Sequence, residues 1–146
     1  MGYIPVDAEW YIAEMVMEIT VHGARSNVLH RNLILLKARS PQEAYDKAIQ
    51  TGQDGQTTHT NPKNQLVEIR FRGISKLDVV YDAIEDGAEL AYEELLGVPE
   101  TQIQQMIAPK EKLEAFIPPN PGQEHDPDYR SKEVMEEAVK MLNKDA

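Results

Sequence analysis

Apolar and polar residues alternate in the first part of the chain, which predicts a long β-strand from Trp10 to His22. One face of that strand carries its main apolar side chains: Tyr11, Ala13, Met15, Met17, Ile19 and Val21. A turn over Gly23–Asn27 leads into a second strand over Val28–Ala38, so the two strands form a predicted β-hairpin. Because both faces of the second strand are apolar over Leu33–Leu36, we expect it to be central and covered on both sides.

The segment Ser40-Pro41-Gln42-Glu43 is typical of a helix N-terminus. Ser40 can accept a hydrogen bond from the backbone N–H of Glu43, and Pro41 occupies the first helical position, where an N–H is not needed. An apolar stripe follows, and we expect Gly52 to end the helix. The stripe consists of Ala44, Tyr45, Ala48 and Ile49. The sequence therefore predicts a short amphipathic helix packed on the sheet.

Further strand signals follow this helix. Thr57–Thr60 suits a short edge strand, and turn-forming residues come next over Asn61–Asn64. Leu66–Ile74 and Leu77–Ala83 are predicted to be two further extended segments. Residues 88–96 combine high helix propensity with alternating polarity, so their pattern leaves helix and strand open.

The C-terminal third contains helical segments and a proline-rich connection. We expect a short helix from Pro99 to about Ile107 and another turn or two over Lys110–Phe116, with Leu113 and Phe116 buried. The predicted divisions are an α+β domain over residues 1–98, a helical extension over 99–117, a linker over 118–130 and an amphipathic helix over 131–146.

Composition restricts the chemistry that the chain can perform. The 146 residues include no cysteine, which excludes disulfides, thiol nucleophiles and cysteine-ligated metals. A formal net charge of −10 argues against binding to nucleic acid or to an anionic membrane surface. Because the N-terminus lacks a signal-peptide pattern and no apolar run is long enough to span a bilayer, we expect a cytoplasmic protein.

The negative charge is concentrated in one stretch. No Lys or Arg occurs between Lys76 and Lys110, whereas this interval contains eight carboxylates. Such a stretch is either a solvated face that keeps the protein soluble or a docking surface for a basic protein partner. The candidate partner surface consists of Asp78, Asp82, Glu85, Asp86, Glu89, Glu93 and Glu94.

Histidines and strand carboxylates are weak candidates for catalysis. His22 and His30 flank the first turn, and Glu14 and Glu18 share a strand face with acid–base potential. His59 is a further candidate. No ligand spacing typical of a metal site is present, and cross-strand ion pairs with Arg70 and Arg72 are the simpler interpretation of the carboxylates. We therefore expect no catalytic residue, metal or other cofactor.

Several motifs together resemble one family. They are Trp10-Tyr11-Ile12-Ala13-Glu14, the run from Asn32 to Ala38, the helix start from Ser40 to Ala48, Phe71-Arg72-Gly73-Ile74, and the segment from Glu85 to Leu90. In this order they are similar to the bacterial DUF4288 family, a domain of unknown function, and the tail beyond Pro99 looks like the extension of cyanobacterial-type members. The resemblance implies a small α+β domain without an established activity, and it favours a strand over Ala88–Glu94.

The sequence thus predicts an α+β fold with about five strands in a predominantly antiparallel sheet, in the order β-β-α-β-β-β. One helix packs on a face of the sheet, and further helices follow at the C-terminus. The expected function is a non-catalytic interaction module that self-associates or binds a basic partner, as an inhibitor or immunity-like protein does. The alternatives are a small hydrolase or metal-dependent enzyme, and a small-molecule sensor with aromatic residues lining a cleft.

Overall fold

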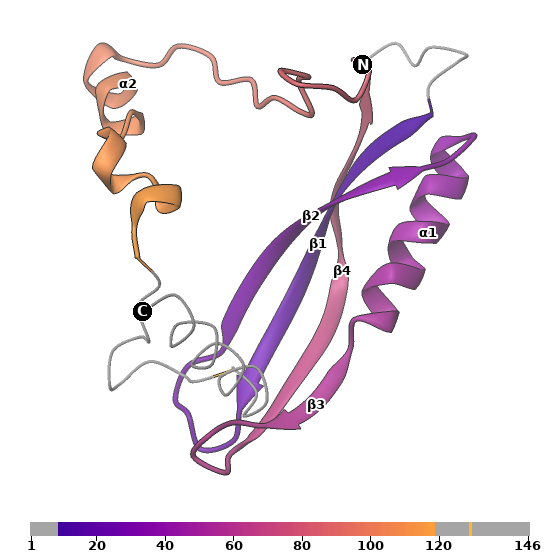
Figure 1. Ribbon diagram of the computed structural model, residues 1–146, viewed down its shortest axis with the longest axis vertical. Helices are drawn as coiled ribbons and strands as arrows, with labels where there is room; N and C mark the ends of the chain where they lie inside the picture. Colours follow the sequence, from indigo (N-terminus) through magenta and orange to yellow (C-terminus); the bar gives the residue numbers. More distant parts are fainter. Residues whose placement is uncertain (1–8, 119–128, 130–146) are drawn as a thin grey trace, which may run out of the picture. The chain divides into compact units, whose positions relative to one another are not determined.

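The computed structural model describes residues 9–118 and Tyr129. Its sheet contains strands β1 (Trp10–Val21), β2 (Val28–Lys37), β3 (Thr57–Thr60) and β4 (Leu66–Val80), and helix α1 (Pro41–Asp54) lies along the sheet (Figure 1). The strand order is β2-β1-β4-β3, and every neighbouring pair is antiparallel. The fold is therefore α+β, with four strands rather than the expected five.

Strand β1 forms the middle of the core. The apolar residues predicted to share one of its faces are all buried, and the side chains of α1 and of the neighbouring strands pack against them. We call this side of the sheet, which α1 covers in part, the inner face, and the opposite side the outer face. Two clusters of buried residues lie on the inner face, one around Tyr11 and Ala44 and one around Ile19, Val21 and Val67.

Strand β2 was expected to be central, and that expectation is wrong. Among the described residues β2 pairs with β1 alone, because β4 occupies the other side of β1. Hydrophobic residues on both faces of a strand usually indicate burial on both sides. Here the leucines of the outer face remain largely exposed.

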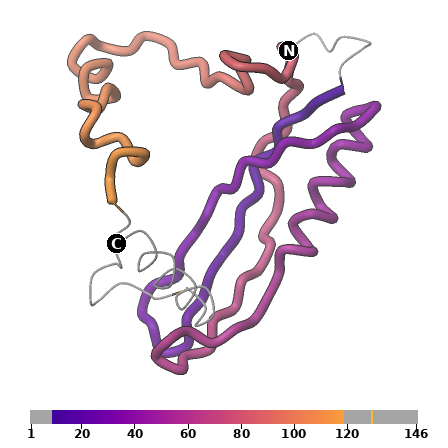
Figure 2. Tube along the Cα trace, viewed as in Figure 1, coloured from indigo at the N-terminus to yellow at the C-terminus, as the bar shows by residue number. Residues whose placement is uncertain are grey.

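Strand β4 is one long strand, although its sequence suggested two extended segments. Its register against β1 shifts twice, so that Ser75 and Arg72 are additional residues without a direct partner on β1. These two β-bulges return Ile74 and Leu77 to the inner face after Phe71, although the three residues are spaced by three rather than two. Figure 2 shows β4 running beside β1 along its length.

The predicted fifth strand is absent from the described chain. Residues 88–94 have no regular secondary structure, so the assignment of Ala88–Glu94 to a strand is wrong. Residues 88–94 pair with none of the four described strands, so their alternating pattern forms no ladder with the sheet. The segment from Leu77 likewise stays in the sheet only as far as Val80.

Helix α1 begins as the sequence predicts and ends later. The Oγ of Ser40 accepts a hydrogen bond from the N–H of Glu43 at 3.1 Å, and Pro41 occupies the first turn. The helix continues through Gly52 to Asp54, and Gly55 is its C-cap. Gly52 is therefore a helical residue, and the aromatic ring of Phe71 packs directly over it.

The N-cap of α1 yields a first prediction. Ser40→Ala removes the side-chain acceptor for the N–H of Glu43, and we expect it to lower the free energy of unfolding by about 1 kcal/mol. Ser40→Asp, which retains an acceptor, should stay close to the wild type. Urea unfolding followed by circular dichroism measures both, and equal stability of Ser40→Ala and Ser40→Asp contradicts a role for the cap.

The chain divides into two units, one of residues 1–91 and 127–146 and one of residues 92–126. The described part of the second unit contains α2 (Glu100–Met106) and two short 3₁₀ helices, η1 (Lys110–Lys112) and η2 (Glu114–Phe116). The helices agree with the expected segments, but Leu113 and Phe116 are exposed rather than buried. A unit this short lacks enough chain to form a core of its own. The linker and helix expected over 118–130 and 131–146 lie outside the described residues, except for Pro118 and Tyr129.

Candidate functional site

The outer face of the sheet carries exposed leucines and ion-paired charged residues. Residues of β1 on this face pair with outer-face residues of β2: Ile12 with Leu35, Glu14 with Leu33, and Val16 with Arg31. No helix of the first unit's described part packs there, because α1 covers the inner face. This face is therefore the place where leucines and charged groups lie side by side.

Three leucines of β2 form an exposed row on the outer face. The exposed fractions are 58% for Leu29, 65% for Leu33 and 41% for Leu35. The three leucines and Arg31 are spaced by two residues along β2, so all four side chains project from the same face of the strand. Single exposed apolar residues are ordinary, but several on one strand form a patch of the kind found at binding sites.

The β-bulge at Ser75 sits next to the most buried carboxylate of the outer face. Glu14 is only 8% exposed, and the hydroxyl of Ser75 donates to its Oε1 at 2.8 Å. Arg31 of β2 lies on the other side, with 3.7 Å between its Nη1 and the same oxygen. These contacts satisfy the Glu14 carboxylate and fix it as a structural link between β1, β2 and β4.

The second carboxylate, Glu18, also has partners. Its Oε2 accepts a hydrogen bond from Nδ2 of Asn27 at 2.7 Å, and its Oε1 lies 3.8 Å from Nε of Arg72. The expected ion pair with Arg72 is thus present, whereas Arg70 lies 3.3 Å from Glu68 on its own strand. Arg31 is a partner that the sequence analysis missed, because only the strand pairing brings it opposite Val16 and beside Glu14.

The strand histidines lie on the other side of the sheet from these carboxylates. His30 pairs with Met17 and His59 pairs with Val67, and both of those partners belong to the inner face. His22 follows the end of β1 and is exposed. The sheet therefore separates His30 and His59 from Glu14 and Glu18, and the structure does not bring them into one pocket.

Tyr129 connects the two inner-face histidines. The Nε2 of His59 donates to the carbonyl oxygen of Tyr129 at 2.7 Å, since a carbonyl can only accept. The ring of Tyr129 meets the His30 ring edge-on, with 5.2 Å between their centroids. Tyr129 also packs against the cluster of Ile19, Val21 and Val67. These contacts give His30 and His59 a packing role.

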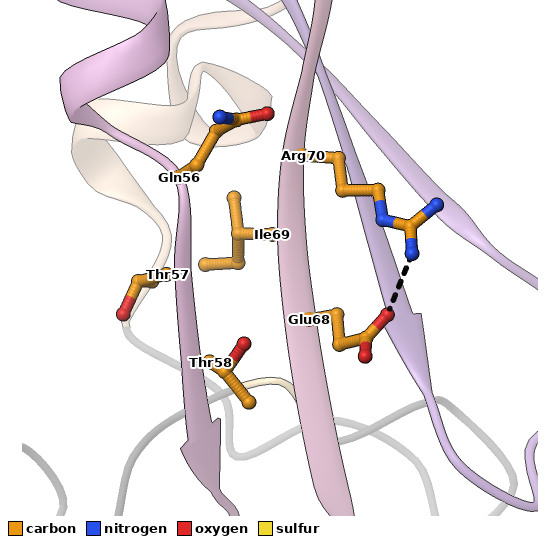
Figure 3. Close-up of a pocket in the computed structure, with 6 residues that line it drawn as sticks. All are labelled: Gln56, Thr57, Thr58, Glu68, Ile69 and Arg70. Carbon is orange, nitrogen blue, oxygen red and sulfur yellow. Dashed lines mark hydrogen bonds and ion pairs between the residues drawn. The ribbon is translucent and has the colours of Figure 1, made fainter.

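A depression of about 320 Å³ lies on the β3–β4 edge (Figure 3). It is open to solvent, and its charged residues Glu68 and Arg70 are paired with each other. The remaining lining residues are Gln56, Thr57, Thr58 and Ile69. No histidine or nucleophile paired with a base lines it, so this depression does not have the composition of a catalytic pocket.

The acidic residues fall into both units of the chain. Asp78, Asp82, Glu85, Asp86 and Glu89 belong to the first unit, and Glu93 and Glu94 to the second. All seven are exposed. Asp82 accepts a hydrogen bond from the N–H of Glu89 at 2.9 Å, which closes the loop that carries Glu85 and Asp86. The carboxylates of this loop are exposed to solvent.

Two other kinds of site are absent from the described residues. They contain no group of three or more histidine or carboxylate side chains placed to hold a metal ion. None of the helices described for this chain has the length and apolar character needed to cross a bilayer.

Comparison with known proteins identifies the family. The model of DUF4288, a domain of unknown function, matches residues 10–92, which is more than half of the chain. The chain belongs to this family, and the matched region contains the complete four-stranded sheet and α1. No curated protein and no solved structure matches the chain.

Proposed function

We propose that this chain is a non-catalytic protein-interaction module that binds through the outer face of its sheet at β2. The observation that carries the proposal is the exposed leucine row of Leu29, Leu33 and Leu35 on an edge strand. Burial of apolar side chains is the main favourable contribution to protein association, and edge strands also offer backbone hydrogen bonds to a partner.

Charged groups lie beside the leucine row on β2 and on the neighbouring strands. Arg31, Glu14, Glu18 and Arg72 form ion pairs on the same face of the sheet. An apolar centre beside paired charges has the composition of a protein–protein interface, in which the apolar part supplies affinity and the polar rim supplies specificity. A catalytic site instead requires a reactive group that is free to contact a substrate.

A second candidate function is binding of a basic partner, as an inhibitor or immunity-like protein does. Its support is the loop closed by Asp82, which holds the exposed side chains of Glu85 and Asp86. Among the described residues these two carboxylates take part in no ion pair, so a cationic partner would not have to displace one.

The enzyme alternative, with His22, His30 or His59 acting together with Glu14 or Glu18, receives less support from the geometry. It requires these groups to converge, yet His30 and His59 belong to the inner face and the carboxylates to the outer face. The interaction function needs no such convergence, because Leu29, Leu33 and Leu35 are already exposed on one face.

A capture experiment with matched variants tests the interaction function. Tagged full-length chain is used to capture proteins from the native host, and bound proteins are quantified by mass spectrometry. We expect Leu29→Ser/Leu33→Ser to reduce the captured amount of at least one protein by about tenfold or more, because both leucine side chains are lost from the interface. Leu90→Ser is the control, since Leu90 is 46% exposed but lies outside the sheet.

The same experiment separates the candidate functions. Loss of capture in Glu85→Gln/Asp86→Gln, with the leucine variant unaffected, supports the basic-partner function instead. If wild type, leucine variant and carboxylate variant capture the same proteins in the same amounts, including other copies of the chain, the interaction function through these surfaces is wrong.

A further inference from the structure

The outer edge of β2 is open in the described part of the chain. β2 has ten residues and pairs there with β1 alone. In an edge strand, alternate backbone N–H and C=O groups face away from the sheet and can pair with another extended strand. Long edge strands with apolar side chains are rare in monomeric proteins, because they promote association.

The opposite edge of the sheet has a different character. β3 has only four residues, and its sequence is Thr57-Thr58-His59-Thr60. A short, polar edge strand is one of the ways in which proteins avoid edge-to-edge association. Beyond β3, residues 70–80 of β4 have no described partner strand on that side, but the β-bulges at Arg72 and Ser75 interrupt this edge, and bulges also hinder edge-to-edge association. Among the described strands, β2 is therefore the long, regular edge that can receive another strand.

The geometry points to a second copy of this chain as the occupant of that edge, paired antiparallel through β2. This inference rests on the proposed interaction function and names the partner. Two copies related by a two-fold axis perpendicular to the sheet would join their sheets into one of eight strands. Such an arrangement keeps both α1 helices on the same face and closes the open edges against each other.

The sequence of β2 selects one register for this pairing. With the axis at Asn32, Leu29 of each copy lies opposite Leu35 of the other on the outer face. On the inner face, Val28 lies opposite Leu36 of the second copy. Apolar cross-strand pairs therefore form on both faces, and each occurs twice because the contact is symmetric.

Charge repulsion disfavours one neighbouring register, and loss of apolar pairs disfavours the other. An axis at Arg31 places the two Arg31 side chains directly opposite each other, and like charges in that position are destabilising. An axis at Leu33 places Leu29 opposite Lys37 and leaves a single apolar pair on the outer face. With the axis at Asn32, Arg31 lies opposite Leu33 and keeps its ion pair with Glu14.

Cysteine cross-linking tests both the pairing and its register. The chain contains no cysteine, so each introduced thiol is the only one. Asn32→Cys places the two thiols on the axis, where directly opposite Cα atoms are about 4.5–5.5 Å apart, within disulfide range. We expect purified full-length Asn32→Cys to form a disulfide-linked dimer under mild oxidation. Leu33→Cys, whose thiols are diagonal neighbours, should form much less.

A second measurement uses the chain without cysteine. Analytical ultracentrifugation should show a reversible dimer of the wild type, with a Kd on the order of 1–100 µM because one strand pair buries a small interface. Leu29→Lys should raise this Kd about tenfold or more, since each dimer loses two apolar pairs. Leu90→Lys serves as the matched control and should leave it unchanged.

Each outcome decides the proposal. A monomeric wild type at about 500 µM, well above the expected Kd, overturns the dimer. Cross-linking that is stronger at residue 33 than at residue 32, or that is weak at residue 32 in a dimeric chain, overturns the register. A monomer that still captures another protein in a leucine-dependent manner removes the second copy as partner but leaves the interaction function intact, so the two failures are distinguishable.

Discussion

Replacing Gly52 with alanine is expected to lower the free energy of unfolding by about 2 kcal/mol, although helix propensity alone predicts a gain of about 1 kcal/mol. A Cβ on Gly52 would lie 2.3 Å from Cδ1 of Phe71 and 2.4 Å from Cε1. These atoms belong to a ring that packs between α1 and the inner face, so relief of the overlap requires the ring or the helix to move.

The neighbouring Gly55 provides the control for this substitution. It is the C-cap of the same helix, its φ of −78° suits any residue, and a Cβ there would meet its nearest atom at 3.4 Å. Gly55→Ala should therefore change stability by about 0.5 kcal/mol or less. Both variants are measured by denaturant unfolding of the full chain.

A double-mutant cycle identifies the cause. Phe71→Ala removes the three ring atoms that the new Cβ would contact, so Gly52→Ala should be less harmful in the Phe71→Ala background than in the wild type. A stabilising Gly52→Ala, or equal effects in both backgrounds, shows that close packing of Phe71 is not what requires glycine at this position.

Replacing Asn61 with alanine is expected to lower the free energy of unfolding by about 3 kcal/mol. Asn61 is fully buried at the turn between β3 and β4, and its Oδ1 accepts from the N–H groups of Lys63 and Gln65 at 3.0 and 2.8 Å. Its Nδ2 also donates to Oε1 of Gln65 at 2.8 Å. Alanine removes this acceptor and leaves polar groups of the turn without it, and each such loss costs about 1–3 kcal/mol.

Asn27→Ala is the matched control, because it makes the same change in the other hairpin turn. Asn27 is exposed and donates to Oε2 of Glu18 at 2.7 Å, so its loss should cost about 0.5–1 kcal/mol. Urea unfolding of the two variants gives the comparison. If Asn61→Ala is no more destabilising than Asn27→Ala, the buried amide does not organise the β3–β4 turn as described.

Local patterns were sufficient for β1 and for the start of α1. The apolar face of β1 is a period-two pattern over twelve residues, and it is buried as predicted. Ser40 caps the helix through an atom only three residues from its partner, so the sequence contains the complete interaction. The edge position of β3 also follows from its short, polar sequence.

Long-range pairing decided the features that were not predicted. The two bulges of β4 interrupt its alternation between Phe71 and Leu77, and only pairing with β1 shows that one strand continues through them. The end of α1 was misplaced because a glycine usually signals a helix end, whereas Gly52 is present to accommodate Phe71.

The candidate site also depends on strand pairing that the sequence alone does not reveal. The sequence placed Glu14 and Glu18 on one strand face and predicted ion pairs for them, but the Glu14 partner Arg31 depends on the pairing of β1 with β2. The exposed leucine row was missed because the apolar residues of β2 indicated burial. The edge position that exposes them follows from β4 taking the other side of β1.

The sequence by itself determined the α+β class, the core face of β1, the capped helix and the excess of carboxylates after Lys76. These depend on side-chain periodicity, on contacts between residues close in the chain, and on composition. The tertiary structure alone decided which strand lies at the edge and that the sheet separates the inner-face histidines from the carboxylates. It also placed the leucines of β2 on an open face. Strand order and register are properties of residues distant in sequence, and their energies appear only when those residues meet.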